Sequence, residues 1–406
     1  MQLLDCNDAS LRLWRDDQDT FSIGIAWFDE HRYHFGDSAW RQARRAPRTV
    51  NNRYWHRLST QPLSPALGPA RHTADLVHAH LEALLADTSG EITLVIPGVM
   101  EPAQLSLLLG ILQTLPATPT AVVHRSALIG AGQGEACAHV ELHLHQASVT
   151  AVAIADHSAI AGETQLLPGS GLLGLIDEIA EIIGQQFVSQ TRFDPQRRAD
   201  TEQSLYEQIP SLLRSLAAQG EVSCAVEGHT ARINTEMLRP VGQYFSAALA
   251  PLIPAGTSLI ALDSLLAILP GLSLSSATGE ALLIRTVTPE AITKASASLP
   301  PPGGELVFQR QVGCVSADTA ATDTTPQARI TMPAITHYLV AGRAKPLTAG
   351  AIIATGITVV SAGEIAIAEG ADATLNNAPV DGVIHPEVGD TLMASGVEVH
   401  FIAVES

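Results

Sequence analysis

Several residue types are scarce in this 406-residue chain, and each scarcity excludes some classes of protein or partner. Its four cysteines lie far apart without a CxxC pair, which excludes a disulfide framework and fits a reducing compartment. Lysine and arginine number 23 against 41 aspartates and glutamates, and the net charge of −18 argues against nucleic acid or an anionic membrane as a partner. No apolar run approaches the length of a membrane span without a charge, glycine or proline. Since Asp5 and Asp8 lie where a signal peptide needs a basic and then apolar start, we expect a cytoplasmic protein.

Apolar residues are plentiful, at 46% of the chain, although aromatics make up only 4%. That content can fill a large core, and the length suits about two or three domains. Through residue 290 apolar strands alternate with helical patterns, which predicts an α/β fold of mixed sheets covered by helices. The spacing predicts helices in HTADLVHAHLEALLADT, in PAQLSLLLGILQTL and through residues 172–217, and strands in EITLVIP and TAVVHRSALIGAG. The basic stretch within residues 33–59 reads as a further helical piece.

The composition changes near residue 290. Residues 291–328 contain LPPPGGE and SADTAATDTTPQ, which are typical of a linker or exposed loop, although GELVFQRQV within them can form a strand of either neighbour. Residues 329–406 consist of short strands separated by Gly and Asn, which predicts an all-β sandwich.

Three passages in order carry a family resemblance. They are GDSAWRQARRAPRTVNNRYWHRL, EITLVIPGVMEPAQLSLLLGIL and the block of helices and a hairpin from 172 to 254. Together they resemble the nucleotide-binding domain of DnaK-like heat-shock chaperones. The resemblance implies an actin-like ATPase fold (ribonuclease H-like) over residues 1–290, with lobes of about 1–165 and 166–290. The sandwich, opened by LVAGRAKPL and closed by VEVHFIAV, resembles a forkhead-associated (FHA) domain.

The resembled family holds ATP and magnesium with two Gly/Thr hairpins and acidic residues, and this chain has replaced those motifs. The first hairpin position reads DCNDAS, which keeps Asp5 and has Asn7 in place of a glycine or threonine. The second reads ELHLHQ from Glu141, with no glycine, and the adenosine-side Gly-Gly-Ser is replaced by Asp263, Ser264 and a leucine. Since glycine lets backbone N–H groups approach phosphate, we expect at most a vestigial nucleotide site at these residues.

A histidine-rich passage stands at the second hairpin. In HVELHLH, the period of two in a strand places His139, Glu141, His143 and His145 on one face. A His-x-His pair with a nearby carboxylate has the spacing of a zinc or other divalent-metal site. A solvated polar face and a pH sensor are the alternatives.

Two further segments suggest recognition. Phosphothreonine-reading FHA domains use an Arg, a Ser and an Asn, and Arg343, Ser361 and Asn377 stand in similar places here, although other parts of the motif are missing. The basic stretch Arg41–Arg57 is either a solvated face or a surface that docks on an acidic partner or on the chain's own acidic surface.

These observations predict a non-enzymatic pseudo-ATPase scaffold or adaptor that binds protein partners through its cleft and its C-terminal β domain, without a resident cofactor. The alternative is a weak ATP-binding or ATP-hydrolysing protein in which Asp5 and Glu141 hold magnesium.

Overall fold

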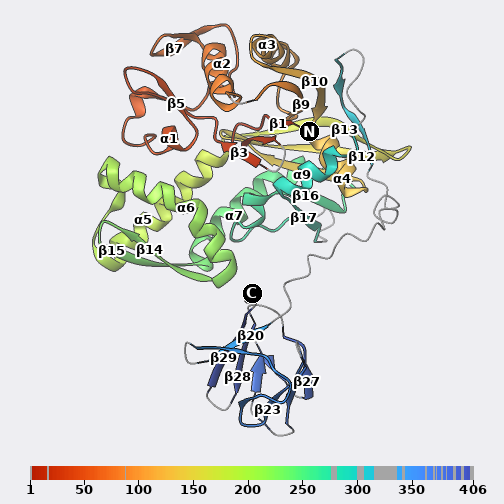
Figure 1. Cartoon of the computed structure of the whole chain (residues 1–406). Coiled ribbons are helices and arrows are strands. Elements are labelled where there is room, and N and C mark those ends of the chain that lie inside the picture. The colour runs from red at the N-terminus through yellow and green to blue at the C-terminus, as the bar shows by residue number, and fades with distance from the viewer. Residues whose placement is uncertain are drawn as a thin grey trace. The chain divides into compact units, whose positions relative to one another are not determined.

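The chain forms two compact units, Met1–Ser316 and Ala317–Ser406. The computed structural model describes residues 2–15, 18–86, 88–275, 281–299, 306–314, 336–340, 343–361, 364–368, 371, 373–375, 378–380, 382–386, 390–394 and 397–402. The class is mixed α/β, as the sequence predicts (Figure 1). Within the described ranges, no helix is both long and apolar enough to cross a membrane.

The first sheet of unit 1 has six strands in the order β18-β10-β9-β1-β2-β3. Their bounds are β1 (Leu3–Asp5), β2 (Leu11–Arg15), β3 (Gln18–Ser22), β9 (Gly90–Ile96), β10 (Ala117–His124) and β18 (Phe308–Gln309). The first three strands form an antiparallel meander, and β9 and then β10 add in parallel on the other side of β1.

The second sheet repeats this plan in the order β17-β16-β11-β12-β13-β19. Its strands are β11 (Cys137–Leu142), β12 (Gln146–Ala155), β13 (Ser158–Pro168), β16 (Leu259–Asp263), β17 (Leu283–Val287) and β19 (Gln311–Gly313). Here β11, β12 and β13 form the antiparallel meander, while β16 and β17 add in parallel beside β11. The carboxyl ends of β1, β11 and β16 therefore belong to parallel strand pairs, the position at which α/β sheets usually bind ligands.

Helices and three small sheets complete unit 1. The helices are α1 (Asp37–Trp40), α2 (Thr73–Leu84), α3 (Pro102–Leu112), α4 (Arg125–Gln133), α5 (Leu172–Thr191), α6 (Ala199–Gln219), α7 (Thr235–Leu249), α8 (Ser264–Ala267) and α9 (Pro289–Ser296), with 3-10 turns at Pro47–Thr49, Pro195–Arg197 and Ala250–Leu252. The small sheets comprise β4 (Ala26–Phe28), β5 (Tyr33–Phe35) and β6 (Val50–Asn51), then β7 (Pro62–Leu67) and β8 (Ala70–His72), then β14 (Glu221–Val226) and β15 (His229–Asn234).

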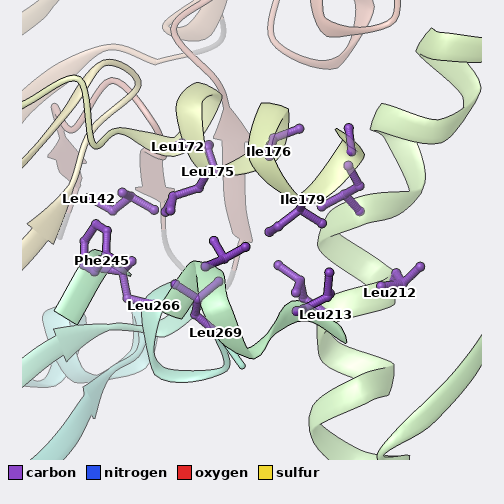
Figure 2. Packing of buried hydrophobic residues seen from close by; sticks show 14 of the residues in the cluster. Leu142, Leu172, Leu175, Ile176, Ile179, Leu212, Leu213, Phe245, Leu266 and Leu269 are labelled. Carbon is purple, nitrogen blue, oxygen red and sulfur yellow. The ribbon is translucent and has the colours of Figure 1, made fainter. Parts of the chain in front are cut away.

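The largest apolar cluster joins the end of β11 to the helices α5 to α8 (Figure 2). In α5, Leu172, Leu175, Ile176 and Ile179 recur every three or four residues, so one helix face is buried. Leu212 and Leu213 of α6, Phe245 of α7 and Leu266 of α8 complete the same cluster (Figure 2). The periodic helices at 73–84, 102–112, 172–191 and 199–219 agree with the sequence-based prediction.

Three local assignments from the sequence are wrong. TAVVHRSALIGAG was taken as one strand, but β10 ends at His124 and α4 follows, because the His124 side chain accepts from the Ser126 N–H and caps the helix. The histidine-bearing strand ends at Leu142, so residues 143–145 form the β11–β12 loop. Residues 33–59, predicted as a helical piece, contain β5, the four-residue helix α1, turns, a 3-10 turn and β6.

The first unit extends beyond residue 290, where the sequence analysis places its end. Helix α9 packs on α4, β18 pairs with β10, and β19 pairs with β13. The described part of the expected linker 291–328 therefore adds an edge strand to each main sheet, and GELVFQRQV belongs to unit 1.

Unit 2 contains two antiparallel sheets around one apolar cluster. Their orders are β21-β20-β29-β28-β25-β26 and β22-β23-β24-β27. The strands are β20 (His337–Val340), β21 (Arg343–Pro346), β22 (Ile352–Ala354), β23 (Ile357–Ser361), β24 (Glu364–Ile367), β25 (Ala373–Leu375), β26 (Ala378–Pro379), β27 (Gly382–Ile384), β28 (Thr391–Ala394) and β29 (Val397–Ile402). Tyr338, Ile357, Ile365 and Phe401 are among the buried residues between them.

Candidate functional site

A cleft of about 970 Å³ opens where strand ends of both main sheets meet. Asp5 ends β1, Arg125 follows directly after β10, and Asp263 ends β16. All three line the cleft floor together with Ser264. This volume lies at the upper end of the range typical of ligand sites.

The guanidinium of Arg125 is bonded to three carboxylates at this floor. Its Nε donates to Oδ2 of Asp5 at 3.0 Å, and its Nη1 donates to Oε1 of Glu141 at 3.0 Å. Both Nη1 and Nη2 donate to Oδ1 of Asp263 at 3.1 Å. Side-chain exposure is 4% for Arg125, 2% for Asp5, 0% for Glu141 and 13% for Asp263. The network therefore connects the first sheet to the second through buried, charged groups.

Burial and the neighbouring charges act in opposite directions on this network. Burial is the largest single effect on Glu141 and Asp263 and acts to raise their pKa values, but Arg125, His139 and the other neighbouring groups together outweigh it and lower both pKa values. For Asp5 burial wins, and its pKa is raised. Burial opposes the charge on Arg125, yet the three carboxylates hold the pKa of Arg125 well above its usual value. Arg125, Glu141 and Asp263 are therefore all ionised at neutral pH.

Backbone N–H groups of the loop after β1 donate hydrogen bonds to other groups of the chain. The Asn7 N–H donates to Oδ1 of Asp5 at 3.3 Å, and the Ala9 N–H donates to Oδ1 of Asn7 at 3.0 Å. The Cys6 N–H donates to the Val95 carbonyl at 2.9 Å. Asn7 is fully buried, and its Nδ2 has no partner among the described residues. The loop thus satisfies internally the amides that a phosphate loop directs toward its ligand.

The β11–β12 loop is closed in a similar way against α5. The Leu172 N–H donates to the His143 carbonyl at 2.8 Å, and the Leu173 N–H donates to the Leu144 carbonyl at 3.1 Å. A Cβ on Gly171 would collide with the backbone of His145, so glycine is needed for this close approach. The first N–H groups of α5, which otherwise attract anions, are already satisfied by the chain.

Asp8 joins the two loops directly. Its Oδ1 accepts the Leu144 N–H at 2.9 Å, and Nδ1 of His143 lies 3.7 Å from the same oxygen. A carboxylate of the chain therefore receives an amide hydrogen bond of the kind that a phosphate oxygen receives in a nucleotide site. The sequence analysis did not predict this bond.

The three histidines of the motif have different nearest partners. Nδ1 of His139 is 2.9 Å from the Ser126 hydroxyl, and Nε2 of His143 is 3.1 Å from the Ser148 hydroxyl. His145 lies in the loop, with its Nε2 2.7 Å from the Asn52 carbonyl. No group of three or more His, Cys, Asp or Glu side chains in the described ranges is placed to hold a metal ion.

The basic segment docks on acidic residues of the same chain. Arg44 pairs with Asp177 of α5 and lies 3.7 Å from Glu202 of α6. Its guanidinium carbon lies 3.9 Å from the centre of the Tyr206 ring. Arg45 pairs with Asp200 at 2.9 Å. The chain's own acidic surface, one of the alternatives from the sequence, is thus the observed contact for these two arginines.

The residues expected to read phosphopeptides do not form a described cluster. Arg343 begins β21 and Ser361 ends β23, which belong to different sheets of unit 2. The Ser361 hydroxyl donates to Oε2 of Glu364 at 3.0 Å. Asn377 lies outside the described residues.

Comparison with known proteins adds no relative. No family model matches the sequence, and no curated protein matches it significantly. Of the residues singled out in the sequence, Asp5, Glu141 and Asp263 come together around Arg125. His139 lies beside them, with its Nε2 3.8 Å from Oδ1 of Asp263, whereas His143 and His145 have other partners. The structure also adds Arg125, a charged side chain directly after the apolar strand β10, and Asp8, in the loop after β1.

Proposed function

We propose that the chain is a non-enzymatic scaffold or adaptor that binds protein partners through its cleft and through unit 2. In this proposal, unit 1 is a degenerate relative of the DnaK-like, actin-like ATPases. The repeated plan of the two main sheets supports the relationship, because such a two-lobed fold carries one similar sheet in each lobe. The three sequence passages given above support it independently.

One observation carries the loss of ATPase activity: the Arg125 guanidinium is bonded to Asp5, Glu141 and Asp263. Magnesium bound by the same carboxylates would have to displace a buried cation that is hydrogen-bonded to all three of them. Asp8 adds to this, because its carboxylate accepts from the Leu144 N–H and would repel a phosphate at the same amide. Binding of Mg·ATP here would require both sets of bonds to break.

Calorimetric titration with ATP and magnesium, together with a phosphate-release assay, tests the proposal. We expect no micromolar binding and no turnover above background. Micromolar binding accompanied by turnover that Asp5→Ala abolishes would overturn it.

The second candidate is a weak ATP-binding or ATP-hydrolysing protein of the DnaK-like chaperone type. It is favoured by one observation, since Asp5, Asp263 and Ser264 line one cleft that is large enough for a ligand. The same assays separate the two candidates, because only this one requires turnover.

Unit 2 is proposed to be an FHA-like interaction module. Its two antiparallel sheets enclose one apolar cluster, as in a β-sandwich.

A further inference from the structure

We propose that a second pocket of unit 1 binds a small uncharged polyol, a molecule whose hydroxyl groups both donate and accept hydrogen bonds. The pocket has a volume of about 200 Å³ and shares no lining residue with the larger cleft. Its lining comes mainly from the loop after β1, the loop between β9 and α3, and the start of β12. This volume is below the range of drug-sized ligands and suits a molecule no larger than a monosaccharide. The inference adds a small-molecule ligand and does not depend on the scaffold proposal.

The side chain of Gln146, the first residue of β12, is the observation that points to a ligand. Gln146 lines the pocket and is only 7% exposed. Within the ranges that the structure describes, its side-chain amide has no hydrogen-bond partner. A buried amide without a partner is unfavourable, and almost all such groups in proteins bond to another group. A molecule bound in this pocket satisfies the amide.

Two further polar groups line the same pocket without a partner. Oδ1 of Asp8 accepts the Leu144 N–H at 2.9 Å, but no described group of the chain donates to its Oδ2. The ring of His56 is partly buried and makes no hydrogen bond with any described residue. Burial is the largest effect on His56 and lowers its pKa, so the ring is neutral at pH 7. A neutral ring has one nitrogen that donates and one that accepts.

These three groups define the chemistry of the ligand. The Asp8 carboxylate only accepts hydrogen bonds, whereas Gln146 and His56 can each both donate and accept. An ammonium group only donates, and it would leave the N–H groups of Gln146 unpaired. A hydroxyl group donates and accepts, so a molecule with several hydroxyls can pair with all three side chains.

The charges of the pocket argue against an anionic ligand. Asp8 and Glu101 both line it, and no arginine or lysine of the described ranges does. Arg53 and Arg57 lie near the His56 ring without lining the pocket. A ligand that carries a carboxylate should therefore bind more weakly than its uncharged counterpart.

Much of the remaining wall of the pocket is apolar. Pro97, Val99, Met100 and Leu166 contribute to it, and Leu166 is 47% exposed. Water against these side chains lacks hydrogen-bond partners there, so its displacement by the C–H groups of a ligand is favourable. A polyol carries C–H surface as well as hydroxyls, whereas a cluster of water molecules does not.

Methyl NMR on the full-length chain tests the inference, because Met100 lines the pocket and Met237, in α7, does not. The methionine methyl groups are labelled with carbon-13, and glycerol, erythritol, xylitol, D-sorbitol and myo-inositol are added one at a time. We expect at least one of them to shift the Met100 signal in a saturable manner and to leave the Met237 signal in place. The dissociation constant should be about 10 mM or less, as suits ligands of about six to twelve non-hydrogen atoms.

Two glutamine variants show whether the unpaired amide holds the ligand. Gln146→Leu removes this amide and should weaken the binding at least about fivefold. Gln243→Leu, on the exposed face of α7, is the matched control and should leave the binding unchanged.

The wild-type titrations decide the matter even if the Gln146 variant folds poorly. The inference is overturned if none of the five polyols gives a saturable shift of the Met100 signal, or if D-gluconate binds more tightly than D-sorbitol. It is also overturned if Gln146→Leu leaves the affinity unchanged. These outcomes leave the scaffold proposal standing, since the ATP assays test that proposal separately.

Discussion

Replacing Arg125 with methionine is the most direct test of the cleft-floor network. The substitution keeps an unbranched apolar stem and removes the cation that Asp5, Glu141 and Asp263 share. Removing one partner of a buried ion pair generally costs about 3–5 kcal/mol, because the remaining charge is left without compensation. Since three carboxylates lose their counter-ion here, we expect a loss of at least about 3 kcal/mol in the free energy of unfolding at pH 7.

The loss should depend on pH. In the wild type, the lowered pKa values of Glu141 and Asp263 give stability that is present above their unfolded values, near 4, and is lost as the pH falls through the folded values. Without Arg125, the largest effect that lowers these pKa values is lost, so burial, the largest remaining effect, raises the pKa values of the three carboxyls. A raised carboxyl pKa gives stability at low pH that is lost as the pH rises. The variant should therefore lie closer to the wild type at pH 5 than at pH 7.

Urea denaturation followed by tryptophan fluorescence measures both effects. All four tryptophans of the chain lie within residues 14–55, so the signal reports on unit 1. Arg239→Met is the matched control, because Arg239 pairs with Glu236 on the surface and such exposed pairs contribute little to stability. A loss below about 1 kcal/mol for the Arg125 variant at pH 7, or a loss that grows on acidification, would refute the reasoning.

Three other substitutions test separate parts of unit 1. Asp8→Ala should lower the free energy of unfolding by about 1–3 kcal/mol and speed hydrogen exchange at the Leu144 amide. Asp8→Asn keeps an acceptor oxygen, so exchange at this amide should be slower than in the Ala variant. Equal exchange in the two variants would contradict the assigned bond. Gly242→Ala should destabilise unit 1 in the same urea assay, because the added Cβ would collide with backbone atoms of a neighbouring turn. Gly110→Ala, in an open part of α3, should stabilise unit 1 by about 1 kcal/mol. A Gly242 variant that is more stable than the Gly110 variant would be inconsistent with the packing. Arg44→Ala should cost about 1 kcal/mol at low salt and less at high salt, and a cost independent of salt would argue against the ion pairs with α5 and α6.

Long periodic segments made much of unit 1 predictable. In α5 and α6 the apolar residues recur over 20 and 21 residues, so periodicity alone identifies the helices. The strand β9 and the β14–β15 hairpin are similarly marked, the latter by Gly228 at its turn with a φ of 79°. These elements depend on local pattern, which sequence reasoning reads well.

The site was harder to predict because it depends on contacts between distant segments. Arg125 stands 120 residues from Asp5 and 138 residues from Asp263, and nothing local indicates that they meet. The apolar run around Arg125 also concealed the start of α4, since β-branched residues before it favour a strand. The resemblance described above pointed to Asp5, Glu141 and Asp263 as site residues. It did not show that a side chain of the chain itself neutralises part of their charge.

The cation at the junction of the two main sheets is covalently attached, and this has a consequence for how the junction responds to its surroundings. A dissociable ion would leave the carboxylates when its concentration in solution fell. The guanidinium of Arg125 is tethered one residue beyond β10, so its occupancy is set by folding and is independent of any solute supply. The coupling between the sheets should therefore survive exhaustive dialysis and chelators, and should change only with conditions that unfold unit 1 or protonate its carboxylates.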